Sequence, residues 1–200
     1  MIESPHTDAP AEELLRLLSR AERLESLPRT GWQICGVERP ESVAAHVHGV
    51  MLVALWLADH HPDPRPNVER VMRIAMVHDL SEAMLTDLPR PVKQLIGKAA
   101  VDRAEDRAAD LILGQLPSWR AAFQEYRDAK TLEARIVKVA DRIQMLAKAL
   151  EYRQHQRGDV ARFFADQESF DARGVQPAVA VFAALRARFD EGRWFDSHFE

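Results

Sequence analysis

Hydrophobic and polar positions repeat with the period of an α-helix along most of the chain. Seven segments show this pattern, and they span residues 11–27, 42–60, 68–85, 92–116, 119–126, 131–156 and 177–191. No stretch alternates apolar and polar residues for long enough to predict a strand. The pattern therefore predicts an all-α fold, a compact bundle of about seven helices around one core.

The boundaries of these segments carry the signals that helix ends require. Ser42 stands at the start of the second segment, where its hydroxyl can cap the first turn. Residues 61–66 hold three alternating prolines, which cannot continue a helix. Residues 42–60 are apolar nearly all round, so we expect this helix to be buried on most of its faces.

Length and composition favour a single domain. The 200 residues divide into a flexible N-terminus (1–10), the main helical domain (11–165) and a C-terminal helix and tail (166–200) that we expect to pack on the same domain. The chain has 27 Lys and Arg against 31 Asp and Glu, a net charge of −4. This balance gives no basic surface for a nucleic acid polymer, which is not an expected partner.

Cysteine content and hydropathy exclude other classes. A single cysteine, Cys35, can form neither an internal disulfide nor a zinc–thiolate cage. The first fifteen residues are polar and acidic, unlike a signal peptide. The longest apolar stretch, residues 47–58, is too short to span a bilayer. We therefore expect a soluble cytoplasmic protein without a membrane partner.

Ionisable residues inside apolar helix are the informative positions of an all-α domain. His46 lies within the most apolar segment, His78 and Asp79 follow an apolar run, and Asp141 interrupts another one. A buried carboxylate without a partner is unfavourable, so each of these positions should be neutralised or should bind a cation.

Each of these residues also has an ordinary structural interpretation. His46 alone is typical of a hydrogen-bonded core histidine, and helical periodicity does not distinguish it from His48. Asp141 alone could form an ion pair with Lys138 or Arg142 on the same helix. Taken singly, none of these residues decides a function.

The set of residues is more informative than its members. Glu82 follows His78 by four residues, which predicts that both lie on one helix surface together with Asp79, and Asp87 comes just after that helix. Two histidines and two aspartates from three helices would form a mixed nitrogen and oxygen site, suited to Mn, Co, Fe, Mg or Zn. Glu82 and Asp87 would be additional carboxylates beside the metal, able to orient or deprotonate a water.

The order His46, His78-Asp79, Asp141 resembles the signature of the HD-domain metal-dependent phosphohydrolases. Flanking motifs are similar to those of its small 5′-deoxynucleotidase branch, and they occupy residues 28–32, 39–43, 78–82, 86–89 and 133–141. Many members have glycine where Thr86 stands here. No histidine occurs between Asp79 and Asp141, which argues against the dinuclear members.

The resemblance implies a homodimeric hydrolase that converts deoxynucleoside 5′-monophosphates to deoxynucleoside and phosphate. It implies one divalent metal, with a second, weaker site considered near Glu82 and Asp87. The family spacing selects His46 rather than His48 as a ligand. The implied roles are metal ligation by His46, His78, Asp79 and Asp141, catalysis by Glu82 and Asp87, and substrate binding by Arg29, Trp32, Asp87, Leu88, Pro89 and Arg90.

Two other functions remain open at this stage. One is an HD-type phosphohydrolase that acts on another phosphate ester, although the sequence has no clustered Lys and Arg for a triphosphate. The other is a catalytically silent nucleotide-sensing protein that keeps the site without turnover.

Overall fold

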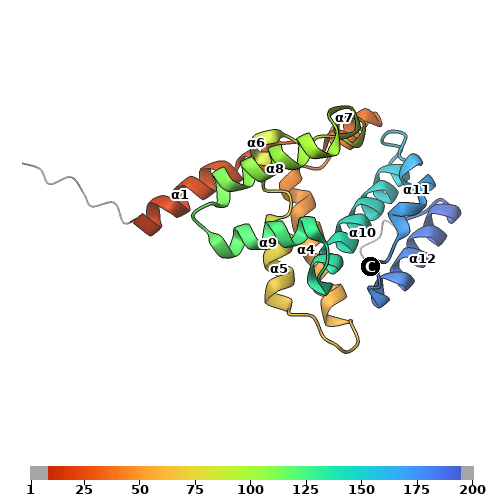
Figure 1. Cartoon of the computed structure of the whole chain (residues 1–200). Helices are drawn as coiled ribbons and strands as arrows, with labels where there is room; N and C mark the ends of the chain where they lie inside the picture. Colours follow the sequence, from red (N-terminus) through yellow and green to blue (C-terminus); the bar gives the residue numbers. More distant parts are fainter. Residues whose placement is uncertain (1–8, 195–200) are drawn as a thin grey trace, which may run out of the picture.

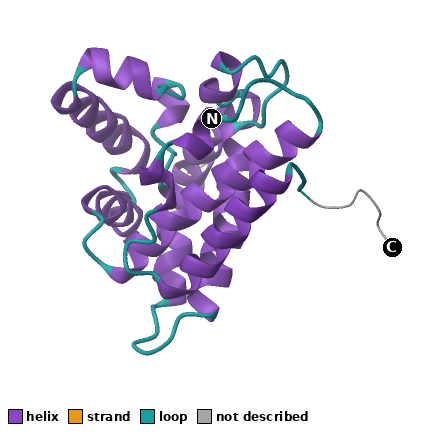
Figure 2. Ribbon diagram, turned by 90° about the vertical axis from the view of Figure 1, so that its right-hand side faces the viewer, coloured by secondary structure: helices purple, strands orange, loops and turns teal. Residues whose placement is uncertain are grey.

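The structure of the protein, a computed structural model, describes residues 9–194. Within this range the chain is helical and has no β-strand (Figure 2); an isolated bridge pairs Pro28 with Ser42. Eight helices have seven or more residues, close to the expected seven. The predicted all-α fold class is confirmed.

The helical elements follow one another with short connections. In chain order they are α1 (Ala9–Ala21), α2 (Arg23–Ser26), α3 (Thr30–Ile34), α4 (Val43–Asp59), α5 (Val68–Val77), α6 (Glu82–Leu85), α7 (Arg90–Ile96), α8 (Lys98–Leu113), α9 (Pro117–Asp128), α10 (Leu132–Gln154), α11 (Arg162–Ala165), the 3₁₀ turn η1 (Gln167–Phe170) and α12 (Gln176–Glu191).

The long helix α10 is the centre of the bundle, and α4, α5, α9 and α12 pack around it (Figure 1). Side-chain caps define where its main helices begin. Ser42 accepts a hydrogen bond from the Ala45 amide at the start of α4, and Thr131 accepts one from the Ala134 amide at the start of α10. These caps satisfy amide groups that the first helical turn leaves unpaired.

Helix α4 is buried or half-buried on most of its faces, as expected, but one side of the helix is uncovered. Leu52 and Trp56 are 58% and 45% exposed, and His48 is exposed as well. The other side carries Val43, Val50 and Leu57, which are fully buried. The apolar residues of α4 thus divide between the core and an uncovered surface.

The single helix predicted over residues 68–85 is broken in its middle. Helix α5 ends at Val77, residues 78–81 form turns, and α6 begins at Glu82. Backbone hydrogen bonds across this break span three residues rather than four, as from Leu80 to Val77 and from Glu82 to Asp79. Tightening to 3₁₀-type bonding changes the direction in which His78 and Asp79 project.

The C-terminal segment returns to the N-terminal part of the domain. Gly158, at φ +78°, lies so close to this part that a Cβ atom there would come within 2.5 Å of the Cys35 carbonyl oxygen. The Asp159 amide donates to that same oxygen at 2.7 Å. Helix α12 packs on α10, and its Phe182 and Leu185 side chains are buried in the core.

The predicted flexible N-terminus falls almost entirely outside the described residues, apart from Ala9 and Pro10, which begin α1. The proposed division at residue 165 stays a prediction. None of the described helices has the length and apolar character needed to cross a membrane.

Candidate active site

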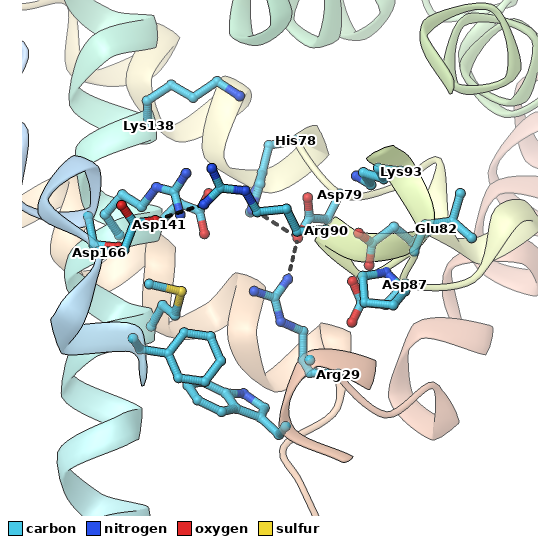
Figure 3. Close-up of a pocket in the computed structure, with 18 of the residues that line it drawn as sticks. Arg29, His78, Asp79, Glu82, Asp87, Arg90, Lys93, Lys138, Asp141 and Asp166 are labelled. Carbon is cyan, nitrogen blue, oxygen red and sulfur yellow. Dashed lines mark hydrogen bonds and ion pairs between the residues drawn. The ribbon is translucent and has the colours of Figure 1, made fainter. Parts of the chain in front are cut away.

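A cavity of about 870 Å³ brings together side chains from distant parts of the sequence (Figure 3). Nearly all of the residues that the sequence selected line it; they are Arg29, Trp32, His78, Asp79, Glu82, Asp87, Leu88, Pro89, Arg90 and Asp141. His46 is the exception, since it is fully buried behind the cavity wall. His48 is exposed and lies apart from this group.

Three of the four predicted metal ligands form a tight cluster beside the cavity, and the fourth, Asp141, adjoins this cluster through His46. His46, His78 and Asp79 offer ligand atoms that all lie within 4.8 Å of one another. The Nε2 atom of His46 is 3.6 Å from Asp79 Oδ2 and 3.3 Å from Asp141 Oδ1, and the Nε2 atom of His78 is 3.2 Å from Asp79 Oδ2. The Nε2 atoms of the two histidines and the carboxylate oxygens of the two aspartates thus face one small volume.

Both histidines are held so that the same ring nitrogen faces that volume. The Nδ1 atom of His46 lies 2.6 Å from Gln144 Oε1, and that of His78 lies 2.7 Å from the Ala75 carbonyl oxygen. Because each partner is an acceptor, each Nδ1 carries the proton and leaves Nε2 with a lone pair. The two Nε2 atoms are buried and have no hydrogen-bond partner. Such unpartnered nitrogens beside carboxylates fit a divalent cation.

The Asp141 carboxylate contacts His46 and the Tyr126 hydroxyl, which donates to Oδ2 at 3.1 Å. Among the described residues it forms no ion pair with Lys138 or Arg142, the alternative that the sequence left open. Burial opposes ionisation of Asp141, but in the metal-free protein the protonated forms of His46 and His78, together with Arg29, outweigh it and hold its pKa well below the ordinary value. Asp141 is therefore a charged oxygen donor at neutral pH.

Glu82 is the carboxyl group whose environment is least favourable to charge. Burial, together with the neighbouring carboxylates of Asp79 and Asp87, raises the pKa of Glu82 to about 10. Its Oε2 atom is buried without a hydrogen-bond partner. A carboxyl group in this state can hold a proton near neutrality and is a candidate for acid–base chemistry.

Arg29 reaches into the cavity from the segment before α3 (Figure 3). Its guanidinium Nη1 donates to Asp79 Oδ2 at 3.3 Å. Although burial disfavours the charged form, the surrounding carboxylates raise the pKa of Arg29 above its ordinary value. The Asp87 carboxylate accepts a hydrogen bond from the Thr30 amide at 2.5 Å and so anchors the segment that carries Arg29.

The turn between Glu82 and Asp87 contains a strained residue. Thr86 has φ +66° and ψ +168°, a region that glycine occupies almost exclusively. A glycine preference at this position, noted for the family, thus has a backbone explanation. This turn directs Asp87 toward the cavity, and the following Leu88 and Pro89 form part of its wall.

Trp32 and Arg90 occupy opposite environments. Trp32 is only 2% exposed, its indole nitrogen donates to Glu41 Oε1 at 3.1 Å, and its ring packs on Tyr152 and Phe163. Arg90 stands at the exposed rim, where Nη1 donates to Asp166 at 2.7 Å. Both residues line the cavity, but most of the Trp32 ring packs against neighbouring side chains and only a small part of it faces the cavity.

Sequence reasoning missed several residues that the fold adds to the site. Lys138 lines the cavity, burial lowers its pKa to about 8, and its ammonium lies 3.4 Å from the Tyr126 ring centroid. Lys138 and Gln144 stand three residues before and after Asp141, so the helical period around that ligand could have indicated both. Glu41 lies inside the 39–43 motif that carries the family resemblance, although that motif did not indicate its contacts with Trp32 and Gln144, and Tyr126 carried no sequence signal.

Comparisons with known proteins agree with this arrangement. A family model described as an HD domain matches residues 21–179. The 5′-deoxynucleotidase hdd1 of Schizosaccharomyces pombe is 31% identical over 160 residues, which cover 76% of this chain and 78% of that protein. The human 5′-deoxynucleotidase HDDC2 is 32% identical over 161 residues, covering 77% and 76% of the two chains.

Solved structures show the same fold. A conserved hypothetical protein from Pyrococcus furiosus aligns with a TM-score of 0.75 and 32% identity over 86% of this chain and 99% of its own. A predicted metal-dependent phosphohydrolase from Magnetospirillum magnetotacticum aligns with a TM-score of 0.64 over 92% and 95% of the two chains; at 22% identity it supports the fold alone. The chain belongs to the HD-domain family. The two curated relatives named above are 5′-deoxynucleotidases, so the predicted resemblance is confirmed.

Proposed function

We propose that this protein is a metal-dependent phosphomonoesterase that hydrolyses deoxynucleoside 5′-monophosphates to deoxynucleoside and phosphate. The observation that carries the proposal is the convergence of two unpartnered imidazole nitrogens and two carboxylates at the wall of the cavity that Arg29 and Glu82 line. The relatives from Schizosaccharomyces pombe and human are named 5′-deoxynucleotidases, which supports this substrate class. A cavity of about 870 Å³ is large enough for a nucleotide.

The proposed ligands of one divalent cation are His46, His78, Asp79 and Asp141. Two neutral imidazoles and two carboxylates balance a charge of +2, and they suit Mn, Co, Mg, Fe or Zn. When bound there, the cation would lower the pKa of a water and polarise a phosphoryl oxygen. A second, weaker cation site near Glu82 and Asp87 stays a prediction.

The substrate would bind between Arg29 and the turn that follows α6. The planar guanidinium of Arg29 can donate to two phosphate oxygens and offset their charge. Asp87 would accept a hydrogen bond from the deoxyribose 3′-hydroxyl, while Leu88, Pro89 and Arg90 would line the same side. Trp32 would form the apolar wall beside the sugar or base.

Glu82 would manage the proton of the reaction. Its unpartnered Oε2 atom can receive a proton from the attacking water or pass one to the leaving 5′-oxygen. The negative charge of the nearby Asp87 carboxylate raises the pKa of Glu82 and would therefore help Glu82 to hold this proton.

One observation favours a second candidate, hydrolysis of a more highly charged phosphate ester. The cationic residues of the cavity are scattered in sequence, but the fold gathers them; they are Arg29, Arg90, Lys93, Arg127, Lys138, Arg142 and Arg162. Lys138 and Arg142 have no carboxylate within ion-pair distance among the described residues. A nucleoside di- or triphosphate is therefore the alternative substrate.

The deciding experiment is phosphate release from metal-stripped protein that is resupplied with Mn, Co or Mg. Deoxy- and ribonucleoside mono-, di- and triphosphates are compared, with Asp79→Ala as the inactive variant and His48→Ala as the control. Metal-dependent release from deoxynucleoside monophosphates, lost only in Asp79→Ala, is the expected result. Release from triphosphates alone would favour the second candidate, and nucleotide binding without release would favour a sensing protein.

We also propose a homodimer that acts in the cytoplasm. The exposed side of α4 carries Leu52 and Trp56, and a second copy is the proposed cover for these apolar side chains. Light scattering should give twice the chain mass, and Trp56→Glu should shift the mass toward that of one chain. An unchanged mass in the variant would contradict a dimer through α4. The cytoplasmic location is a separate proposal, and imaging of the tagged protein in cells tests it.

A further inference from the structure

A chain of hydrogen bonds connects the candidate ligand His46, through Gln144 and Glu41, to Trp32. The Nδ1 atom of His46 lies 2.6 Å from Gln144 Oε1, and the Gln144 amide nitrogen donates to Glu41 Oε2 at 2.8 Å. The other oxygen of Glu41 accepts from the Trp32 indole at 3.1 Å. The His46 and Glu41 side chains are 0% and 5% exposed, so water does not compete for these bonds.

The identity of each group determines the direction of every bond in this chain. The Trp32 indole can only donate, and the Glu41 carboxylate uses one oxygen to accept from it and the other to accept from Gln144. Because the Gln144 NH₂ group faces Glu41, its carbonyl oxygen must face His46. The His46 Nδ1 atom must then carry the proton, and Nε2 keeps the lone pair that a metal requires.

The two candidate histidine ligands differ in how this orientation is secured. The partner of His78 Nδ1 is the Ala75 carbonyl, a backbone group whose acceptor character no substitution changes. The partner of His46 is an amide side chain that could present either end. The Gln144 amide keeps its orientation because Glu41 accepts a hydrogen bond from its NH₂ group. The tautomer of His46 therefore depends on Glu41, although these two side chains share no hydrogen bond.

A glycine on α4 supplies an independent observation. A Cβ atom at Gly49 would lie 2.8 Å from Gln144 Cγ and 3.2 Å from its amide nitrogen. The absence of a side chain at position 49 therefore leaves the space in which Gln144 connects His46 to Glu41.

We propose that Glu41 and Gln144 are positioning residues that set the tautomer of His46 and thereby the affinity of the site for a divalent cation. The inference rests on the proposed metal site, and it assigns a function to residues outside the ligand set. Outer partners of this kind typically change metal affinity by about 10- to 100-fold when they are altered.

The substitution Glu41→Gln tests the direction of the chain while keeping its shape. The new amide would use its oxygen to accept from Trp32 and would turn its NH₂ toward Gln144. Gln144 would then reverse and present NH₂ to His46, which would move the ring proton to Nε2. A role in packing alone predicts that this nearly isosteric change is tolerated.

Two readouts measure this effect, with Glu38→Gln as an exposed control. Nitrogen-15 NMR of the metal-free protein reports the tautomer of His46 directly, and calorimetric titration with Mn or Co reports affinity. For Glu41→Gln we expect the Nε2–H form and a metal affinity about 10- to 100-fold lower. An Nδ1–H tautomer together with wild-type affinity would overturn the proposal.

The double variant Glu41→Gln/Gln144→Glu provides the reciprocal test. The amide at position 41 would donate to the carboxylate at 144, which would in turn accept the Nδ1 proton of His46. This exchange restores the original direction, so we expect the tautomer and the affinity to return toward wild type. A double variant that binds as weakly as Glu41→Gln would contradict the relay.

Gly49→Ala serves if Glu41→Gln does not fold, as judged by circular dichroism. Its added methyl group should displace Gln144 and weaken metal binding. The adjacent substitution His48→Ala should leave metal binding unchanged. Equal metal affinities of the Gly49→Ala and His48→Ala variants would overturn the proposal. A wild-type protein that binds neither Mn nor Co would refute the proposed metal site. The tautomer in the metal-free protein would still decide the relay.

Discussion

The two halves of the candidate site are built in different ways. His46 and Asp141 lie within α4 and α10, regular helices of 17 and 23 residues that pack on each other. His78, Asp79 and Glu82 lie at the break between α5 and α6, where the backbone leaves regular helix. Regular helices hold side chains in place accurately, whereas irregular backbone allows several polar groups to converge from a short stretch of chain.

The two halves also differ in the pKa values of their carboxyl groups. In the helical half, Asp141 faces His46 and its pKa is held low despite burial. In the irregular half, burial and the carboxylates of Asp79 and Asp87 raise the pKa of Glu82 to about 10. Asp79 in the irregular half is also held charged, since His78, His46 and Arg29 outweigh burial and lower its pKa. Both halves therefore supply a charged carboxylate for a cation, and the irregular half also contains Glu82, the group able to exchange a proton.

The largest expected effect comes from breaking the helical half. Asp141→Ala removes a charged oxygen from the proposed ligand set, so phosphate release should fall by at least about 10⁴-fold, equivalent to about 5 kcal/mol of barrier. Metal content should fall with it. Asp59→Ala, an exposed aspartate on α4, is the control, and a fully active Asp141→Ala would exclude this residue from the site.

In the irregular half, Glu82→Gln should separate chemistry from metal binding. Loss of the exchangeable proton should lower kcat by about 10²- to 10⁴-fold. The metal affinity measured by titration should remain, because Glu82 is not a proposed ligand of the tightly bound cation. Turnover near the wild-type rate with metal bound would remove Glu82 from the mechanism.

The same variant should change the pH dependence of stability in the metal-free protein. Because the pKa of Glu82 is about 10 in the folded state and lies near 4.5 when unfolded, the unfolded chain loses this proton first as pH rises. Its contribution to folding is fully present below pH 4.5 and declines as pH increases toward 10. Glu82→Gln should therefore stabilise the protein at pH 8, by about 1–3 kcal/mol, and by much less near pH 5.

Denaturant unfolding of both proteins at the two pH values measures this difference. Glu38→Gln, which changes an exposed carboxyl group, should show no such dependence. An equal effect of Glu82→Gln at pH 5 and pH 8 would show that Glu82 is charged in the folded protein.

The smallest expected effect concerns the strained turn. Thr86→Gly should stabilise the fold by about 1 kcal/mol, because relief of about 1–3 kcal/mol of backbone strain exceeds the added entropy of glycine in the unfolded chain. Ala129 lies at φ +51° and ψ +31°, in the ordinary left-handed region, so Ala129→Gly should raise the free energy of unfolding by less. Denaturant midpoints compare the two, and a destabilised Thr86→Gly would show that the threonine side chain stabilises the turn.

The sequence predicted the helical half better than the irregular one. Apolar periodicity located α4 and α10, and the ionisable His46 and Asp141 stood out against it. The same periodicity predicted one helix over residues 68–85, because it does not register the change to 3₁₀-type bonding at the His78-Asp79 pair. The exposed side of α4 was missed for a related reason, since an apolar pattern does not show which face another element covers.

The sequence by itself determined the all-α fold class, the ends of α4 and α10 to within about two residues and the residue types that could bind a metal, because these depend on local periodicity, caps and charge. Only the tertiary structure decided which nitrogen of each histidine faces the site. It also decided that Asp141 contacts His46 and Tyr126, and that scattered cations share one cavity. Such properties depend on contacts between segments far apart in the chain, such as Glu41 with Gln144, which local patterns do not encode.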